Sequence, residues 1–382
     1  MLTPQTPGEL AEALGSAGSR KQTVALNGAG SKRRMAGPLP EAEVVISTAG
    51  LGGIVQYEPG DLTISVCAGM RWRELVRVLA EKKQMIPLDP PFGEEATVGG
   101  VVAANTSGPR RRLYGTARDM VIGMKFALID GRLAQTGGMV VKNVAGLDMA
   151  KLLIGSFGTL AAIAVVNFKV TPKPTRERSF LVAFPDAREA DRARMGILKS
   201  VLQPEALDVL SPEVSRELGA EGWTLAVQAG GNEAVVSRYE RELAAFGDGR
   251  AFEGAHETAL WRAIVNFVPQ YLTANPDGAV VRVGCALKDV AAVMEAAGGA
   301  AVARGGAGVV YAGFRYLEFA SAFAGEAVKR GWRPVIEFAP ERQKRNFELW
   351  PSPGEDLEIM KRVKRMFDPE GLLNRGRMYG RI

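Results

Sequence analysis

The order of predicted elements indicates an α+β protein whose two main segments differ in how strands, helices and loops follow one another. In residues 1–174, short strands are separated by glycine-rich loops. In residues 175–349, strands alternate with single helices, which is typical of a split α+β layer of the ferredoxin-like kind. Pro172 and Pro174 interrupt the pattern and predict a boundary there. Residues 350–382 carry one amphipathic helix, so we expect three segments with these bounds.

Local signals predict the elements of the first segment. Thr6, Pro7 and Glu9 form a capping signature, which predicts a helix of about ten residues. Asp130-Gly131 favours a type I′ hairpin. The elements predicted here are a helix from residue 7, strands at 23–26, 44–48 and 62–67, a helix at 72–79, a hairpin within 120–137, a helix at 148–154 and a strand at 160–170.

The later segments are predicted from the same signals. The expected strands are 179–184, 223–230, 279–287 and 307–314, and the expected helices are 186–202, 232–246, 288–297 and 315–329. No internal sequence repeat accompanies this alternation. A second capping signature at 352–355 precedes a last helix with Leu357, Met360 and Phe367 on its apolar side.

The composition is that of a globular protein and argues against several functions. Of the 382 residues, 47% are hydrophobic and 24% are charged, and no apolar run approaches the ~18 residues of a membrane span. Cys67 and Cys285 alone can form neither a disulfide framework nor an iron–sulfur site. The basic residues are not interleaved with aromatic ones, which argues against nucleic acid. Solvated lysines and arginines are the favoured explanation of the net charge of +6, and an acidic partner surface, a membrane headgroup layer and an anionic ligand are the alternatives.

The N-terminal residues show no basic region followed by an apolar stretch, so no signal peptide is expected. The expected location is therefore the cytoplasm, with at most peripheral membrane contact made through partners.

Three stretches of small residues suggest one long ligand. The turn Gly28–Ser31 directly follows a strand, where successive backbone N–H groups can point at one phosphate. Near residue 100, glycines and alanines allow a planar or phosphorylated ligand to approach the main chain. Residues 137–166 are likewise rich in small residues. A glycine-rich loop domain without a ligand is the alternative.

The motifs "LNGAGSK", "TVGGVVAANTSGPRRRLYGTARDMVIG" and "GGMVVKNVAGLDMAKLLIGSFGTL" together resemble the FAD-binding domain of the vanillyl-alcohol oxidase (PCMH-type) superfamily. More narrowly, they resemble the E subunits of bacterial glycolate oxidases. "YEPGDLTISVCAGM", "IPLDPPFGEEAT" and "VKRMFDPEGLLNRGRMY" fit the same subunits. The resemblance implies two α+β subdomains that hold an extended FAD, a cap domain, and a C-terminal helix that returns to the FAD domain.

The resemblance also assigns site residues. It implies pyrophosphate binding by the turn at residue 28, contacts beneath the pyrophosphate and ribityl chain from residue 97 onward, and adenine recognition by the backbone of Ile163. The implied cofactor-binding residues are Asn27, Gly28, Ala29, Gly30, Ser31, Pro90, Thr97, Gly99, Gly100, Ala103, Ala104, Asn105, Ser107, Gly108, Gly115, Arg118, Asp119, Gly146 and Ile163.

Three features remain open at this stage. Arg110–Arg112 do not obviously belong to FAD; a solvated loop is favoured over an anion site or a subunit contact. No histidine precedes His256, and Cys67 fits a packed strand position, so non-covalent FAD is expected. His256 lies in a polar stretch and is expected on the surface or at a helix start. The chain therefore has no obvious general base for oxidising a 2-hydroxy acid, and its catalytic residues and any metal site are unassigned.

Two functional classes and a weaker third follow. The first is an FAD subunit of a multi-subunit glycolate or 2-hydroxy-acid oxidase, working with a sister FAD subunit and an iron–sulfur subunit. The second is a self-sufficient FAD oxidoreductase that uses a base such as Tyr311 or Glu337. The third is a structural scaffold that retains FAD. The resemblance favours the first.

Overall fold

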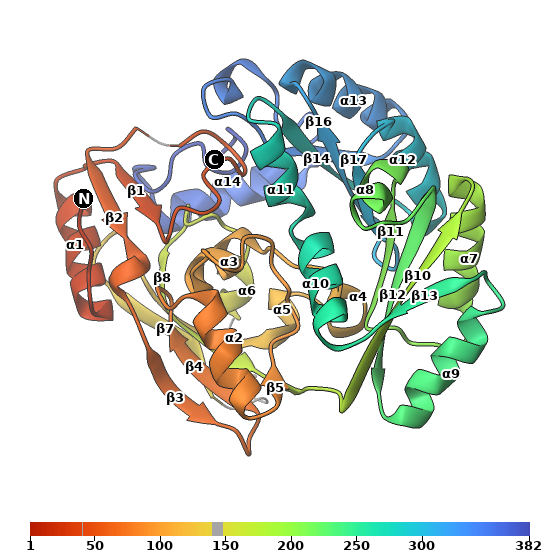
Figure 1. Cartoon of the computed structure of the whole chain (residues 1–382). Coiled ribbons are helices and arrows are strands. Elements are labelled where there is room, and N and C mark those ends of the chain that lie inside the picture. Colours follow the sequence, from red (N-terminus) through yellow and green to blue (C-terminus); the bar gives the residue numbers. More distant parts are fainter. Residues whose placement is uncertain (40, 140–147) are drawn as a thin grey trace. The chain divides into compact units, whose positions relative to one another are not determined.

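The computed structural model describes residues 1–39, 41–139 and 148–382, and the chain divides into two compact units (Figure 1). Unit 1 comprises Met1–Ser107, Gly115–Lys173 and Pro353–Ile382. Unit 2 comprises Gly108–Tyr114 and Pro174–Ser352. The seven residues 108–114 therefore pack with unit 2, although both neighbouring stretches of the chain belong to unit 1.

Unit 1 is built on a five-stranded antiparallel sheet with the order β3-β4-β8-β6-β7 and on a parallel pair, β1-β2. Its strands are β1 (Val24–Asn27), β2 (Val44–Ser47), β3 (Ile54–Glu58), β4 (Thr63–Cys67), β5 (Gln84–Met85), β6 (Val121–Ala127), β7 (Leu133–Gly137), β8 (Ala162–Lys169) and β9 (Thr171–Pro172). Its helices are α1 (Pro7–Ser19), α2 (Trp72–Glu81), α3 (Val98–Ala104), α5 (Ala117–Met120), α6 (Met149–Leu153) and α14 (Asp356–Phe367).

The local predictions for unit 1 are confirmed at the first helix and at the hairpin. The Thr6 side chain accepts a hydrogen bond from the backbone N–H of Glu9 and caps α1. β6 and β7 pair as a hairpin around Asp130-Gly131. The core beneath α1 contains Leu10, Leu14 and Ile46 together with Leu373 from the C-terminal segment, so residues far apart in the sequence close one core.

Unit 2 is an eight-stranded antiparallel sheet that repeats one topology twice. The strand order is β13-β10-β12-β11-β15-β16-β14-β17. The first half follows the ferredoxin-like order 4-1-3-2, and the second half follows it in reverse. The halves join edge to edge where β11 pairs with β15. The ferredoxin-like prediction is confirmed, and a structural duplication accompanies it that the sequence does not reveal.

The elements of unit 2 are more numerous than predicted, because several strands are only four to six residues long. The strands are β10 (Arg176–Phe184), β11 (Ala206–Leu210), β12 (Trp223–Gly231), β13 (Gly249–Phe252), β14 (Ala279–Gly284), β15 (Ala301–Arg304), β16 (Val309–Phe314) and β17 (Arg333–Phe338). The helices are α4 (Arg111–Tyr114), α7 (Ala187–Lys199), α8 (Pro212–Glu217), α9 (Glu233–Leu243), α10 (Gly254–Val265), α11 (Phe267–Ala274), α12 (Val290–Ala297) and α13 (Leu317–Lys329).

The two faces of this sheet differ in chemistry. Paired residues of neighbouring strands point to the same side, so the register places one set of polar side chains on a single face: Ser179, Gln228, Asp208, Arg304, Tyr311 and Arg282. The opposite face carries apolar residues such as Val182, Val209 and Val281, all buried. Helices α7, α9, α12 and α13 cover the apolar face (Figure 1).

Candidate functional site

A cavity of about 630 Å³ opens in unit 1, and every residue that lines it belongs to that unit. Its wall is made by the end of β1, the turn that follows, α3, the loop before β8 and the C-terminal segment. Ligand sites commonly measure ~300–1,000 Å³, so the space suits a large organic cofactor.

The turn after β1 offers a row of unused backbone donors. Among the residues that the structure describes, no acceptor receives the N–H groups of Gly28, Ala29, Gly30 and Ser31. All four residues line the cavity, and Gly30 has a φ of 71° that favours glycine. Successive N–H groups in such a turn form an anion-binding concavity, which fits a pyrophosphate.

Helix α3 explains why the segment after Thr97 consists of small residues. The Thr97 side chain caps the helix by accepting from the N–H of Gly100. A Cβ on Gly28 would lie 2.2 Å from Thr97 Oγ1, so the turn and the helix start approach each other closely. A Cβ on Gly99 would lie 2.8 Å from the Cβ of Ala68. Glycine at 99 therefore allows the helix to pack on its own domain, and Gly99, Gly100 and Ala104 also line the cavity.

Lys32 supplies a cation at the cavity wall. Its Nζ lies 5.9 Å from the ring centroid of Phe92, and no carboxylate pairs with it among the described residues. Burial lowers the pKa of the Lys32 ammonium to about 8, and the charge of Glu95 opposes this shift. A bound phosphate would offset the cost of burying this ammonium.

Eleven residues assigned to FAD by the resemblance line the cavity: Asn27, Gly28, Ala29, Gly30, Ser31, Thr97, Gly99, Gly100, Ala103, Ala104 and Ile163. Seven do not line it: Pro90, Asn105, Ser107, Gly108, Gly115, Arg118 and Asp119. Gly146 lies outside the described residues.

Several of the seven have local structural contacts. Asp119 accepts from the backbone N–H of Thr116 at 2.8 Å and starts α5. A Cβ on Gly115 would lie 2.4 Å from Asp119 Oδ2. Arg118 donates to the Lys151 carbonyl at 2.6 Å. Asn105 ends α3 with a left-handed φ of 49°.

Other residues that line the cavity carry no sequence-based assignment, notably Lys32, Phe157, Asn374 and Arg377. Lys32 follows the predicted turn directly, and a basic residue beside a phosphate-type turn was an available signal. Asn374 and Arg377 lie more than 200 residues further along the chain, so only the tertiary structure brings them to the cavity.

The solvated-loop interpretation of Arg110–Arg112 is wrong for two of the three side chains. Within unit 2, Arg110 donates to Glu177 Oε1 at 2.7 Å, and it lies 3.4 Å from Glu205 Oε2. Arg112 donates to the Gln203 side chain at 3.1 Å. Glu205 is almost fully buried, and burial raises the pKa of its carboxyl group, while Arg110 opposes that shift.

The two alternative bases in unit 2 are poorly suited to accept a proton. The carboxylate of Glu337 is already engaged in an ion pair with the guanidinium of Arg282, at a distance of 2.8 Å. Burial raises the pKa of the Tyr311 hydroxyl, so its phenolate form is disfavoured. His256 is exposed in the first turn of α10, as expected.

Cys67 ends β4 as a partly buried strand residue, and burial raises the pKa of its thiol. Among the described residues, no cluster of histidine, cysteine or acidic side chains is arranged to hold a metal ion. None of the helices within the described ranges is long and apolar enough to cross a membrane.

Two family models match the sequence. Residues 1–137 match an FAD binding domain, and residues 342–378 match the C-terminal domain of FAD linked oxidases. Glycolate oxidase subunit GlcE of Escherichia coli (strain K12) is 36% identical over 166 residues, which cover 43% of this chain and 47% of that protein. Glycolate oxidase subunit GlcD of Bacillus subtilis (strain 168) is 28% identical over 211 residues, which cover 55% of this chain and 45% of that protein.

These two matches span about half the length of each relative. A longer match is to the D-lactate dehydrogenase of Archaeoglobus fulgidus, 24% identical and covering 100% of this chain and 91% of that protein.

Solved structures show the same fold. p-Cresol methylhydroxylase superposes with a TM-score of 0.75 at 16% identity, covering 99% of this chain and 88% of that chain. 4-Ethylphenol oxidase from Gulosibacter chungangensis superposes with a TM-score of 0.72 at 14% identity, and the superposition covers 98% of this chain and 88% of that chain. The chain therefore contains a matched FAD-binding domain, shares the fold of these oxidases and is similar in sequence to glycolate oxidase subunits.

Proposed function

We propose that this chain is the FAD-binding subunit of a multi-subunit oxidoreductase for glycolate or a related 2-hydroxy acid. It binds one FAD non-covalently in the cavity of unit 1, with the turn at residue 28 and Lys32 at the pyrophosphate. A sister flavoprotein oxidises the substrate, and an iron–sulfur subunit carries electrons onward.

The observation that carries the proposal is the row of unused N–H groups beside the half-buried Lys32 ammonium in one cavity. An anion satisfies both features at once, because it accepts hydrogen bonds and pairs with the cation. When bound, FAD supplies an acceptor for two electrons. The chain's own residues bind and orient it and surround it with protein.

The subunit role rests on a second set of observations. Oxidation of a hydroxy acid requires a group that removes the hydroxyl proton. Glu337 is held in an ion pair, the phenolate form of Tyr311 is disfavoured, and the single histidine is exposed. Two cysteines cannot supply the four thiolates of a common iron–sulfur cluster. The similarity to two glycolate oxidase subunits supports such partners.

Cofactor binding is tested by precipitating the purified chain with acid. All yellow colour is expected in the supernatant, identified as FAD. Flavin that stays with the precipitate would contradict non-covalent binding. Cys67→Ser is the matched variant, and its FAD content should equal that of the wild-type chain.

The subunit role is tested anaerobically. The pure chain is mixed with excess glycolate or D-lactate while the blue absorption band of the flavin is followed. We expect reduction slower by roughly two to four powers of ten than in the complete assembly, the usual contribution of general base catalysis. Bleaching within seconds by the chain alone would establish the self-sufficient oxidoreductase instead. A flavin that never changes redox state in a working assembly would favour the structural scaffold.

A further inference from the structure

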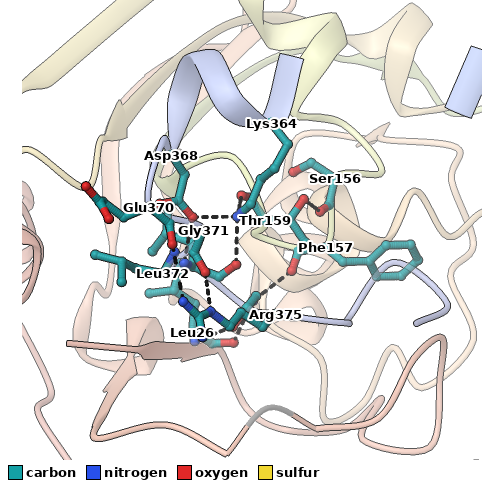
Figure 2. Close-up of polar contacts among 12 residues, drawn as sticks. Leu26, Ser156, Phe157, Thr159, Lys364, Asp368, Glu370, Gly371, Leu372 and Arg375 are labelled. Carbon is teal, nitrogen blue, oxygen red and sulfur yellow. Dashed lines mark hydrogen bonds and ion pairs between the residues drawn. The ribbon is translucent and has the colours of Figure 1, made fainter. Parts of the chain in front are cut away.

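Lys364 is a buried cation that organises the C-terminal segment of unit 1. Its Nζ donates to the carbonyl of Thr159 at 2.6 Å, to Asp368 Oδ2 at 2.5 Å and to the carbonyl of Leu373 at 2.9 Å. Figure 2 shows Lys364 pointing from α14 toward Asp368 and Thr159. All three donors of the ammonium are therefore used.

Asp368 links this ion pair to the backbone of the C-terminal segment. It is 1% exposed, and its two carboxylate oxygens accept from the backbone N–H groups of Leu372 and Leu373 at 2.9 and 2.7 Å. Removing either charge would leave the other buried and unpaired, which is strongly destabilising. The pair thus fixes the chain from residue 368 to residue 373.

The segment fixed in this way runs beside β1. The N–H of Val24 donates to the carbonyl of Leu372, and the N–H of Asn374 donates to the carbonyl of Val24, both at 2.9 Å. Val24 and Leu373 form a parallel bridge. The C-terminal segment therefore acts as an additional strand next to β1, whose far end leads into the turn at residue 28.

Asn374 connects this segment to two parts of the cavity wall. Its Oδ1 accepts from the N–H of Leu26 at 2.7 Å, and its Nδ2 donates to the carbonyls of Phe157 at 2.7 Å and Leu26 at 3.3 Å. Leu26, Phe157 and Asn374 all line the cavity. Asn374 itself is 3% exposed and has a left-handed φ of 42°.

The loop on the other side of Asn374 is conformationally strained. Phe157 has a φ of 53°, which is uncommon for a bulky residue, and Gly158 has a φ of 70°. A Cβ on Gly158 would lie 2.8 Å from Asn374 Nδ2. Asn374 donates to the carbonyl of Phe157, and Lys364 donates to the carbonyl of Thr159 (Figure 2). Such strain persists where the surrounding structure holds the backbone in place.

We infer that Asn374 is a positioning residue of the FAD site and that the Lys364–Asp368 pair is its support. Asn374 joins the backbone before the phosphate-type turn to the loop at Phe157, so the cavity has its binding shape only when the C-terminal segment is docked. FAD binding and docking of that segment are then coupled, and each strengthens the other. This inference rests on the proposed FAD site.

Asn374→Gly tests it, because glycine keeps the left-handed backbone and removes only the three side-chain hydrogen bonds. Asn167→Ala is the matched control, since Asn167 is a buried asparagine of the same unit that accepts a hydrogen bond from Ser65 away from the cavity. The FAD dissociation constant of each apoprotein is measured by quenching of flavin fluorescence, and the thermal unfolding of each apoprotein is measured separately.

We expect Asn374→Gly to weaken FAD binding about tenfold or more. The thermal unfolding temperature of its apoprotein should fall no more than that of Asn167→Ala. Gly158→Ala places a Cβ against Asn374 Nδ2 from the side of the loop, so it should also weaken FAD binding. Bound FAD should also slow proteolysis of the C-terminal segment in the wild-type chain and much less in Asn374→Gly.

Wild-type affinity in Asn374→Gly would overturn the inference, as would equal weakening in Asn167→Ala. The proposed site is distinguished by Gly28→Val. If that variant loses FAD while Asn374→Gly does not, only the positioning role fails. If Gly28→Val retains wild-type affinity, the FAD site itself has been misplaced and the inference fails with it.

Discussion

The cavity of unit 1 and the polar sheet face of unit 2 use charge in opposite ways. The cavity is lined mainly by backbone and small side chains, and Lys32 is left without a carboxylate partner among the described residues. In unit 2, Arg304 pairs with Asp208, Arg282 pairs with Glu337, and Arg110 pairs with Glu177 and Glu205. Unused backbone donors that line a cavity indicate a ligand, whereas charges that pair with one another indicate a structural role.

The comparison also shows which sequence signal misleads. The chain has two runs of three consecutive basic residues, and two side chains of the run Arg110–Arg112 anchor residues 108–114 within unit 2. The inconspicuous "NGAGS" has the unused donors. The other basic run begins at Lys32, which lines the cavity. A run of basic residues therefore does not by itself distinguish a packing contact from a ligand site, whereas the unused backbone donors do.

The largest expected effect is at Gly28. Its substitution by valine places a Cβ within 2.2 Å of Thr97 Oγ1, where neither the turn nor the capped helix start can yield easily. Such overpacking costs about 1–3 kcal/mol, so we expect FAD affinity to fall by up to about 100-fold. Fluorescence titration measures the affinity. Gly52→Val is the control, because nothing lies within 4 Å of that position; an equal loss there would remove the distinction.

Arg110→Met tests the claim that charges in unit 2 are structural. It leaves the buried Glu205 carboxylate without its cation, so we expect unfolding of unit 2 to become easier by about 3 kcal/mol. The control Arg176→Met breaks an exposed pair with Glu233 and should cost less than ~1 kcal/mol. Denaturant unfolding measures both. Equal small costs would show that Arg110 is not an anchor.

The same variant has a pH signature. Burial already raises the pKa of Glu205, and Arg110 opposes that shift. Without Arg110, the folded-state pKa rises further above the unfolded value, so the folded state binds the proton more readily. Acidification from pH 7 toward pH 5 should therefore recover part of the lost stability in Arg110→Met. Stability that only falls over this range would contradict the cause proposed here.

A smaller effect is expected from titrating Lys32. Its pKa of about 8 in the free cavity rises when a pyrophosphate binds, because the anion favours the ammonium form. FAD binding then takes up a proton, and affinity should fall by up to about tenfold between pH 8 and pH 9. Lys32→Gln should bind FAD more weakly below pH 8 and lose this dependence. An unchanged pH profile in Lys32→Gln would place the phosphates elsewhere.

The smallest expected effect is at His256. It is exposed in the first turn of α10 and is not one of the residues that line the cavity. Replacement by glutamine should leave FAD affinity and turnover of the assembled complex within about twofold, the scale of a neutral surface substitution. A loss of turnover by ~100-fold or more would identify it as the missing base and would reverse the assignment of chemistry to a partner.

Local signals of the sequence determined much of unit 1. The cap at Thr6, the hairpin at Asp130-Gly131 and the strand-to-turn junction at Asn27 are decided by neighbouring residues, so they could be predicted. The fold class was predicted from the order of elements, and FAD was predicted from the resemblance of three motifs to a known FAD-binding domain. The short strands β11, β15 and β17 were missed because four to six residues carry little periodicity.

Only the tertiary structure decided what closes the cavity and what the arginines do. Asn374 reaches Leu26 across 348 residues, and Arg110 reaches Glu205 across 95. Hydrogen bonds and ion pairs of this kind depend on atoms meeting within about 3 Å, and no spacing in the sequence encodes that meeting. Gly99 and Gly100 show the same division. The sequence indicated that both positions need small residues, but only the tertiary structure shows that both line the cavity and that Gly99 also packs against Ala68.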